Sequence, residues 1–522
     1  MTATIADGAV QHEPEGIRRV VEAVDRPCFI VRTGRGIGAG TRYPTAPGLS
    51  LLASAPAVPP EHLGDSRFAR HHGTRFPLMA GSMAHGIASV ELVIAMARAG
   101  FLASYGAAAL PLRDVDAAVA RLAREIPDLP FAVNFIHDGR DERGMVELIR
   151  CLTRHRVRCL EVSGNMLISK EVLHYRLSGV TQDRSGAVVP ANRVVAKVAH
   201  PDIALRFLRP VDRTQVGELV AEGRLTADEA RLAERLPLAD DITVEADSGG
   251  HTDGRPLSVL LPAIAALRDQ VQRQYRYAEP VRIGAAGGIG TPHAALAAFS
   301  LGAAYVVTGS INQSCVEAGT SDAARRMLAA AGITDFESAP SPVAFEAGTT
   351  VQVLRAGSRF PVQARRLHQL YDRHDGLDAL PAHERARLER VFRHRLDEVW
   401  RQAAEHKMTT DPAAVTRATA DPKRAMAMVF RWYLAMSSRW AVAGEPDREA
   451  DYQIWCGPAM GAFNDWVRGS HLEEWSNRQV ADVNRHLLRG TAHLARLNQL
   501  TLAGVRLPEE WTRYRIQREN TP

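Results

Sequence analysis

Short apolar runs alternate with amphipathic stretches through the middle of the chain. Eight runs are rich in β-branched and other apolar residues: 75–80, 101–104, 131–135, 158–162, 193–198, 242–246, 281–285 and 304–308. They are apolar on both faces, which is the pattern of parallel strands covered by helices. The stretches 89–100 and 115–126, which lie between runs, carry apolar residues at helical spacing. Eight strands alternating with helices over about 250 residues predict an α/β fold, a closed (β/α)8 TIM barrel.

A doubly wound open sheet is the alternative fold. Such a sheet normally places a glycine-rich nucleotide loop of the form GxGxxG after its first strand. Here the first predicted strand continues into AGSMAHG (80–86), which lacks that pattern. The barrel is therefore the preferred prediction.

The chain divides into three predicted regions. A Pro- and Gly-rich N-terminal extension of low regularity (1–74) precedes the barrel (75–332), and a mainly α-helical C-terminal domain (333–522) follows it. The connection between the fifth and sixth strands, 199–241, is too long for a simple crossover and is predicted to be a helical insertion. Within it, Thr226 and Glu229 have the spacing of a capping box. The sequence leaves open which end of the barrel the insertion covers.

Composition limits the functional class. The chain has 522 residues, of which 46% are hydrophobic and 24% charged, as in a globular protein with a large core. Its formal net charge of +5 is too small to indicate binding to nucleic acid. The five cysteines show no metal-binding spacing, so we expect reduced thiols, no metal site and a cytoplasmic protein. No apolar run reaches transmembrane length and no secretory signal is recognisable, so we expect no membrane partner.

Two turns of small residues follow the seventh and eighth predicted strands, where (β/α)8 enzymes commonly bind phosphate. The seventh strand continues into GAAGGIGTP (284–292), whose Thr-Pro pair is typical of the start of a helix. The eighth strand continues into TGS (308–310). The residues that leave room for backbone amides to approach an anion are Ala286, Gly287, Gly288, Gly290, Gly309 and Ser310. Together the two loops predict a cofactor that carries a phosphate.

The other strand ends fit a flat cofactor lying across the mouth of the barrel. The first strand ends in a turn of small residues on which a ring can rest: Ala80, Gly81, Ser82 and Met83. The third strand carries Asn134, whose amide can pair with a pyrimidine-like edge; the alternative is a polar cap on the strand. The fifth strand carries Lys197, a cation able to stabilise a reduced, anionic ring; the alternative is an ion pair with Glu161 or Glu245.

The sixth strand runs into EADSGGHTDG (245–254), where the side chains are either minimal or ionisable. Gly249 and Gly250 leave space for the cofactor. An imidazole ordinarily titrates near neutral pH, so His251 is the candidate catalytic residue. Asp247 and Asp253 are placed to orient it, and Asp247 is also expected to contact the cofactor. The alternative is a glycine-rich turn with a surface histidine.

With these residues placed, the chain resembles the superfamily of FMN barrels that contains flavin-dependent enoyl reductases and nitronate monooxygenases. It is more similar still to one branch, the trans-acting enoyl reductases of polyunsaturated fatty acid and polyketide synthases. The blocks that carry this resemblance extend from about residue 20 to 500 and include ADDITVEADSGGHTD, GAAYVVTGSINQ, VQVLRAGSRFP, FRWYLAMSSRW and DYQIWCGPAMGAFNDW. The stretches SGNMLISKEV and APSPVAFEAG depart from the family pattern, which bears on the fit of the substrate.

The resemblance implies tightly bound FMN, NADPH as reductant and a 2-enoyl thioester on an acyl carrier protein as substrate. His251 is then the expected donor of the proton that completes reduction of the double bond. Oxidation of a nitronate, with His251 as base, is the alternative within the same fold. A non-catalytic docking component of a synthase is the alternative of another class. A homodimer is one oligomeric state that the sequence leaves open.

Overall fold

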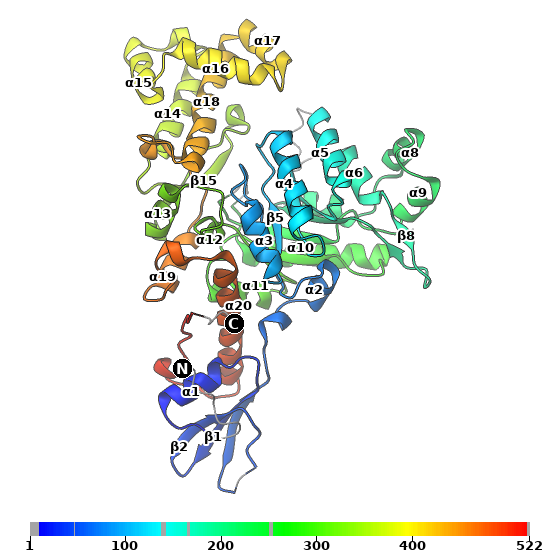
Figure 1. Cartoon of the computed structure of the whole chain (residues 1–522), viewed down its shortest axis with the longest axis vertical. Helices are drawn as coiled ribbons and strands as arrows, with labels where there is room; N and C mark the ends of the chain where they lie inside the picture. The colour runs from blue at the N-terminus through cyan, green and yellow to red at the C-terminus, as the bar shows by residue number, and fades with distance from the viewer. Residues whose placement is uncertain (1–9, 46, 137–141, 164–167, 250–253, 519–522) are drawn as a thin grey trace.

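The protein is built around a closed barrel of eight parallel strands with helices on its outside (Figure 1). The computed structural model describes residues 10–45, 47–136, 142–163, 168–249 and 254–518. The barrel strands are β4 (Leu78–Ala80), β5 (Leu102–Tyr105), β6 (Ala132–Ile136), β7 (Cys159–Ser163), β10 (Arg193–Val198), β11 (Asp241–Glu245), β12 (Arg282–Ala286) and β13 (Val306–Thr308). Neighbours in the barrel follow the chain order, and β13 pairs with β4 to close it. The predicted fold class and its eight strands are confirmed.

Helices follow the barrel strands along the chain, and several of them are amphipathic. The helices are α3 (Val90–Arg98), α4 (Leu112–Glu125), α5 (Glu142–Arg154), α6 (Lys170–Leu177), α7 (Pro201–Leu208), α10 (Leu257–Tyr275), α11 (Pro292–Ser300), α12 (Ser310–Gln313) and α13 (Asp322–Ala330). In α4 the buried residues Val115, Ala118, Val119 and Leu122 recur at three- and four-residue intervals. That spacing places them on the one face that packs on the strands.

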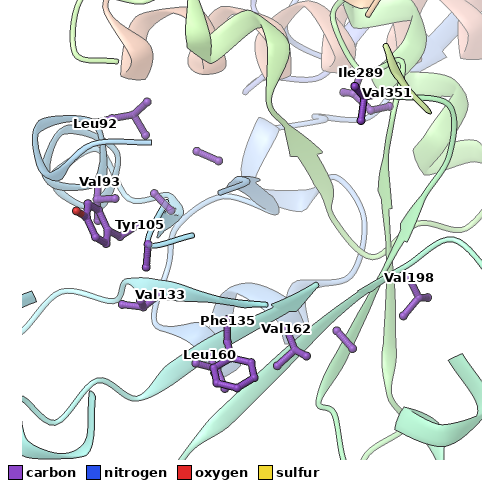
Figure 2. Packing of buried hydrophobic residues seen from close by; sticks show 14 of the residues in the cluster. Leu92, Val93, Tyr105, Val133, Phe135, Leu160, Val162, Val198, Ile289 and Val351 are labelled. Carbon is purple, nitrogen blue, oxygen red and sulfur yellow. The ribbon is translucent and has the colours of Figure 1, made fainter. Parts of the chain in front are cut away.

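Alternation along the strands separates two cores. Val133 and Phe135 of β6 belong to the large core between strands and helices, as do Leu160 and Val162 of β7 (Figure 2). Ala132, which precedes Val133 on β6, belongs instead to a smaller cluster that fills the barrel interior. Since successive side chains of a strand point to opposite faces, every second position on these strands faces the barrel axis.

The N-terminal region differs from the irregular segment expected from its sequence. It contains α1 (Pro14–Glu22), a three-stranded antiparallel sheet of β1 (Cys28–Thr33), β2 (Gly36–Gly40) and β3 (Ser50–Ala55), the short 3-10 helix η1 (Pro60–His62), and α2 (Ser66–His72). The sheet was not recognised partly because β2 (GIGAG) is rich in glycine, which weakens the alternating pattern. Helix α2 closes the amino-terminal end of the barrel, where Phe68 stacks on Tyr305 with ring centroids 4.1 Å apart.

Buried charges line this closed end of the barrel. The Asp241 carboxylate accepts a hydrogen bond from Arg282 Nε at 2.6 Å and lies 2.8 Å from His72 Nε2. Burial by itself would raise the pKa of Asp241, but the charge of Arg282 outweighs burial and holds this pKa well below its usual range. The carboxylate therefore stays ionised and holds the start of β11 to its neighbours.

The helical insertion starts with α7, which directly follows β10. The part after α7 contains α8 (Arg213–Ala221) and α9 (Ala227–Ala233), which pack against α6 on the outside of the barrel. The two ends of this part lie side by side, because Ala239 N donates to Phe207 O at 3.0 Å. A separate small hairpin, β8 (Thr181–Gln182) and β9 (Val188–Val189), lies beside α9. The predicted capping box is confirmed: Glu229 N donates to Thr226 Oγ1 at 3.2 Å, and Thr226 N donates to Glu229 Oε2 at 2.8 Å.

The C-terminal region is mainly helical and packs on the barrel in two places. Its elements are β14 (Phe336–Pro340), η2 (Phe345–Ala347), β15 (Thr350–Leu354), α14 (Phe360–Arg373), η3 (Leu377–Ala379), α15 (Ala382–Phe392), α16 (Leu396–Met408), α17 (Pro412–Ala420), α18 (Pro422–Ala443), η4 (Glu449–Asp451), α19 (Ala459–Val467), η5 (Trp475–Asn477), α20 (Val480–Leu502) and α21 (Glu509–Thr512). Helices α14–α18 form a lobe beside the barrel, and α20 runs from the barrel to the N-terminal sheet (Figure 1). No helix of the described ranges is long and apolar enough to cross a membrane.

Helix α20 is anchored to the barrel by buried polar contacts. Thr308 at the end of β13 donates from Oγ1 to Asn484 Oδ1 at 2.8 Å, and Asn484 Nδ2 donates to Asn312 Oδ1 at 2.8 Å. Helix α20 also packs against α11. The helical domain therefore packs directly against the barrel. The predicted domain boundaries at 74/75 and 332/333 stay predictions.

Candidate active site

A cavity of about 410 Å³ lies at the carboxyl ends of the barrel strands. Its barrel side is formed by strand ends and the loops that follow them. Its other side is formed by α18 and by the segment 453–459, both from the C-terminal region. In a (β/α)8 enzyme this end of the barrel is where the active site lies.

Most of the residues singled out from the sequence line this one cavity. They are Gly81, Ser82, Met83, Asn134, Lys197, Asp247, Gly249, Ala286, Gly287, Gly288, Gly309 and Ser310. Ala80 does not line it, because it is the last residue of β4 and is fully buried in the core between strands and helices. Gly250 and His251 lie outside the described residues. The structure brings the described residues together, and their assignment to a cofactor stays a prediction.

The floor of the cavity is polar because of strand alternation. Asn134, Glu161, Lys197 and Glu245 each stand two residues beyond an inward-facing position on their strands. Asn134 is paired in register with Glu161, and Lys197 with both Ser163 and Thr243. Four neighbouring strands thus contribute one polar layer above the apolar filling of the barrel.

Lys197 forms an ion pair with Glu245, with Nζ and Oε1 3.2 Å apart. The ion pair considered from the sequence is therefore confirmed for Glu245, and Lys197 also lines the cavity. Burial lowers the pKa of Lys197, but the charges of Glu245 and Glu161 outweigh burial, and the pKa is raised overall. The lysine is therefore a fixed positive charge on the cavity floor.

Asn134 is oriented by its neighbours. Its Nδ2 donates to Ser163 Oγ at 2.8 Å, so the amide is also a polar link between two strands. Its Oδ1 accepts no hydrogen bond from the described part of the chain, and the residue lines the cavity. Beside it, Glu161 accepts a hydrogen bond from Ser82 N at 3.1 Å and thereby fixes the first loop. This arrangement leaves a carbonyl oxygen able to accept from a ligand N–H.

The loop after β12 provides a cradle of small residues. Gly288 has φ +74°, and a Cβ placed there would meet no atom within 4 Å. Gly309 likewise has open space where a Cβ would stand. Gly287 is different: with φ +90°, its Cβ would lie 2.8 Å from the carbonyl oxygen of Asp247. Gly288 and Gly309 therefore face free volume, whereas Gly287 is required by close packing of the loop on the end of β11.

Gly290 was expected to help backbone amides approach an anion, and the structure gives it another role. A Cβ at Gly290 would lie 2.3 Å from the carbonyl oxygen of Ala459, at the start of α19. Helix α11 begins two residues later, where the Thr291 side chain accepts from Ala294 N at 3.4 Å. The glycine thus allows the C-terminal region to approach the loop.

The C-terminal wall of the cavity was not predicted from the sequence. It consists of Ser438, Ala441 and Val442 of α18 and of Gln453, Ile454, Trp455, Gly457, Pro458 and Ala459. Two sequence blocks flagged by the resemblance, FRWYLAMSSRW and DYQIWCGPAMGAFNDW, contain or adjoin these residues. Neither block reveals from its pattern which of its side chains would face the barrel, because that depends on how distant segments pack.

His85 is another cavity residue that was not predicted from the sequence. It lies in the AGSMAHG loop, lines the cavity and has φ +60°, a value that is uncommon for a residue other than glycine. Burial, assisted by the charge of Arg439, lowers the pKa of His85. An ionisable side chain among the small residues of this loop could have indicated His85. The loop was instead interpreted only as a turn of small residues.

Comparisons with known proteins agree with this architecture. The profile of the nitronate monooxygenase family matches residues 65–343, and that of the inserted helical domain of [acyl-carrier-protein] S-malonyltransferase matches residues 374–452. The enoyl reductase domain of MlnA, from the macrolactin biosynthesis cluster of Bacillus amyloliquefaciens, superposes with a TM-score of 0.82. It is 37% identical, and the match covers 85% of this chain and 100% of that domain.

Two curated relatives are parts of biosynthetic systems. A polyunsaturated fatty acid synthase polypeptide of Thraustochytrium sp. is 42% identical over 449 residues, which are 84% of this chain and 30% of that protein. Polyketide biosynthesis protein PksE of Bacillus subtilis is 39% identical over 436 residues, 83% of this chain and 56% of that protein. The chain therefore spans about a third to a half of the length of these relatives.

The family match covers more than half of the chain and includes every strand of the barrel. The chain therefore belongs to the nitronate monooxygenase family, and within it is similar to the enoyl reductase domain of MlnA over the whole of that domain.

Proposed function

We propose that the protein is an FMN-dependent enoyl reductase that acts on a 2-enoyl thioester carried by an acyl carrier protein, with NADPH as reductant. The observation that carries this proposal is the cavity of about 410 Å³ at the carboxyl end of the barrel. The small-residue loops, the polar strand ends and the C-terminal wall all meet there. In this fold that position combines phosphate binding with a site for chemistry.

The residues present fit FMN. Gly288 and Gly309 leave open space next to backbone amides where the phosphate would bind, and α11 begins beside them. At the other side of the cavity, the Oδ1 of Asn134 would accept a hydrogen bond from an N–H of the ring. Lys197 would place its positive charge near the ring, where it favours an anionic reduced state. These features support a monophosphate cofactor.

When bound, FMN supplies hydride transfer between NADPH and the β-carbon of the enoyl group. The protein must then provide a proton for the α-carbon, and His251 is the residue we propose for this role. Gly249, two residues before it, packs against the backbone of Cys456. Through this contact the C-terminal region holds Gly249 in place, at the start of the segment that leads to His251.

The substrate class is supported by the wall of the cavity and by the relatives. Ile87, Ala441 and Val442 give the cavity an apolar side suited to an acyl chain. The relatives are named as parts of polyunsaturated fatty acid and polyketide synthesis, and the matched helical domain belongs to an acyl-carrier-protein acyltransferase. We therefore propose an acyl carrier protein of such a synthase as the partner that delivers the substrate.

The proposal is tested first by the cofactor and then by turnover. Heat should release FMN, identified by its mass and absorption spectrum, and anaerobic NADPH should bleach the bound flavin. Addition of 2-butenoyl-pantetheine should then restore the oxidised spectrum and yield the saturated thioester. Bleaching that is reversed only by oxygen, with consumption of a nitronate, would favour the oxidase alternative. A folded protein that binds no flavin would favour a docking component.

A further inference from the structure

The cavity changes in character from its floor to its rim. The floor carries the Lys197–Glu245 ion pair, and the wall above it is apolar where α18 contributes Ala441 and Val442. Arg439 stands three residues before Val442 on the same helix and is exposed. A separation of three residues leaves two helical positions about 60° apart around the axis. Arg439 therefore borders the lining face of α18 at the entrance.

The guanidinium of Arg439 is not neutralised by the described part of the protein. Two other arginines of α18 form ion pairs: Arg424 with Asp421 at 3.2 Å and Arg431 with Glu346 at 3.3 Å. Within the described ranges, Arg439 makes neither an ion pair nor a hydrogen bond through its side chain. The two acidic residues that line the cavity are engaged elsewhere, because Glu245 is paired with Lys197 and Asp247 accepts from Gln352.

Other basic groups surround Arg439. Its charge acts on His85, which lines the cavity on the barrel side, and on His406 near the end of α16. Lys407 also acts on His406, and the lysine forms no ion pair with a described residue. The pKa values of His85 and His406 are both lowered, so neither imidazole adds a positive charge near neutral pH. The positive charge beside this wall of the cavity is therefore that of the Arg439 guanidinium on α18.

We propose that Arg439 binds a phosphate group of the ligand that enters the cavity above the flavin. A guanidinium offers paired N–H donors that match phosphate oxygens, and a site that already has a compensating carboxylate would not need such a ligand. The inference rests on the proposed function, which supplies two phosphorylated ligands. One is a thioester on a phosphopantetheine arm, and the other is the nicotinamide nucleotide. Both present the same phosphate chemistry, and they are separated by experiment.

The experiment compares the wild-type protein with Arg439→Ala and Arg439→Lys. Two thioester probes differ only in the phosphate: 2-butenoyl-pantetheine 4′-phosphate and 2-butenoyl-pantetheine. NADPH is titrated separately in anaerobic flavin reduction. Arg424→Ala is the matched control, because it removes an arginine from the first turn of the same helix, about 22 Å from Arg439 along the axis. Flavin content and the temperature of unfolding are measured for each variant.

We expect Arg439→Ala to weaken the binding of one phosphorylated ligand by about 5- to 20-fold, seen either in the KM for the phosphorylated thioester or in the NADPH concentration needed for half-maximal flavin reduction. The kcat and the flavin content should stay near wild type. A rise for the phosphorylated thioester alone identifies the carrier arm as the source of the phosphate. A rise in the concentration of NADPH needed for half-maximal flavin reduction identifies the nucleotide. Arg439→Lys should recover part of the loss, since it restores the charge without the paired donors.

Two results would overturn the inference without touching the proposed function. In one, the wild-type protein is an active reductase and Arg439→Ala changes the KM for either thioester, and the NADPH concentration needed for half-maximal flavin reduction, by less than about twofold. The other is an equal rise for the two thioesters, which would show that Arg439 shapes the entrance and does not bind phosphate. Absence of flavin reduction in the wild-type protein, by contrast, would remove the proposed function itself.

Discussion

Gly249 of the barrel loop and Cys456 of the C-terminal region are in direct backbone contact. A Cβ on Gly249 would lie 2.9 Å from both the N and the Cα of Cys456. Cys456 is fully buried, and its pKa is raised to about 12 by burial. Two segments separated by about two hundred residues therefore meet at the loop that leads to His251. Because of this contact, the barrel loop and the 453–459 segment cannot move independently of each other.

We expect Gly249→Ala to destabilise the protein and to reduce its flavin content. The added methyl group would meet backbone atoms, which cannot rotate away, so the loop or the 453–459 segment must move. The cost should be about 1–3 kcal/mol in urea unfolding. Gly217→Ala is the control, because Gly217 lies on the exposed face of α8 with no atom near its Cβ position. That substitution should instead stabilise by about 0.5–1 kcal/mol. Equal stability of the two variants would show that the contact with Cys456 does not constrain the loop.

Gly288→Val should lose FMN while the fold survives. The valine side chain would occupy the open space at the cradle, and φ +74° is a conformation that β-branched residues rarely adopt. We expect an affinity for FMN at least about tenfold weaker, measured by fluorescence as the flavin is added back.

Gly302→Val separates the two causes of this loss. Gly302 has φ +95° and open space around its Cβ position, but it follows α11 and does not line the cavity. Both variants carry backbone strain, and only Gly288→Val fills the cradle. If Gly302→Val lost as much flavin, strain and not occupation of the phosphate site would be the explanation.

His251→Ala should retain FMN and the reduction of flavin by NADPH. Turnover of the enoyl thioester should fall by about 10²- to 10⁴-fold, the usual contribution of a positioned acid. The pH profile of turnover should also lose the limb at which an imidazole gives up its proton, at a pH of about 6.5 to 8. His383→Ala is the control, because His383 is an exposed histidine of α15 with 79% of its side chain accessible. A loss of less than about fivefold with full flavin occupancy would contradict the acid role.

The free energy of unfolding should decrease as the pH is lowered, because the Asp241 carboxylate becomes protonated. Its folded pKa lies well below its unfolded value of about 3.9, because the charge of Arg282 outweighs burial. The stability it contributes is thus fully present above about pH 4 and is lost as the pH falls toward the folded pKa. Asp241→Asn should cost about 3–5 kcal/mol at pH 7, because Arg282 is left buried without its partner.

The difference in free energy of unfolding between the wild type and Asp241→Asn should become smaller as the pH falls below about 4. Urea unfolding at several pH values measures it. Asp378→Asn, at a fully exposed carboxylate, should show no such narrowing. A difference that is constant with pH would mean that the folded pKa of Asp241 is not depressed.

The barrel and the strand ends that carry the candidate site residues could be predicted from the sequence. The strands could be located because parallel strands buried on both faces leave continuous apolar runs, and the helices because α4 and its counterparts repeat every three to four residues. The loops after β12 and β13 could be recognised because small residues such as Gly288 and Gly309 cluster there and do not fill a core. Knowing the strands also places their carboxyl ends together, since all of them are parallel.

The segments that cover the site and close the barrel could not be predicted, because their positions depend on contacts between distant parts of the chain. Ser438, Val442 and Trp455 line the cavity because α18 and the 453–459 segment pack over the mouth, and the helical pattern of α18 has buried residues on more than one side. Likewise Phe68 fills the closed end of the barrel from a segment whose sequence looked irregular. Contacts between distant segments depend on shape and on the pairing of specific atoms, as at Gly249 and Cys456, and leave no periodic signal in either segment.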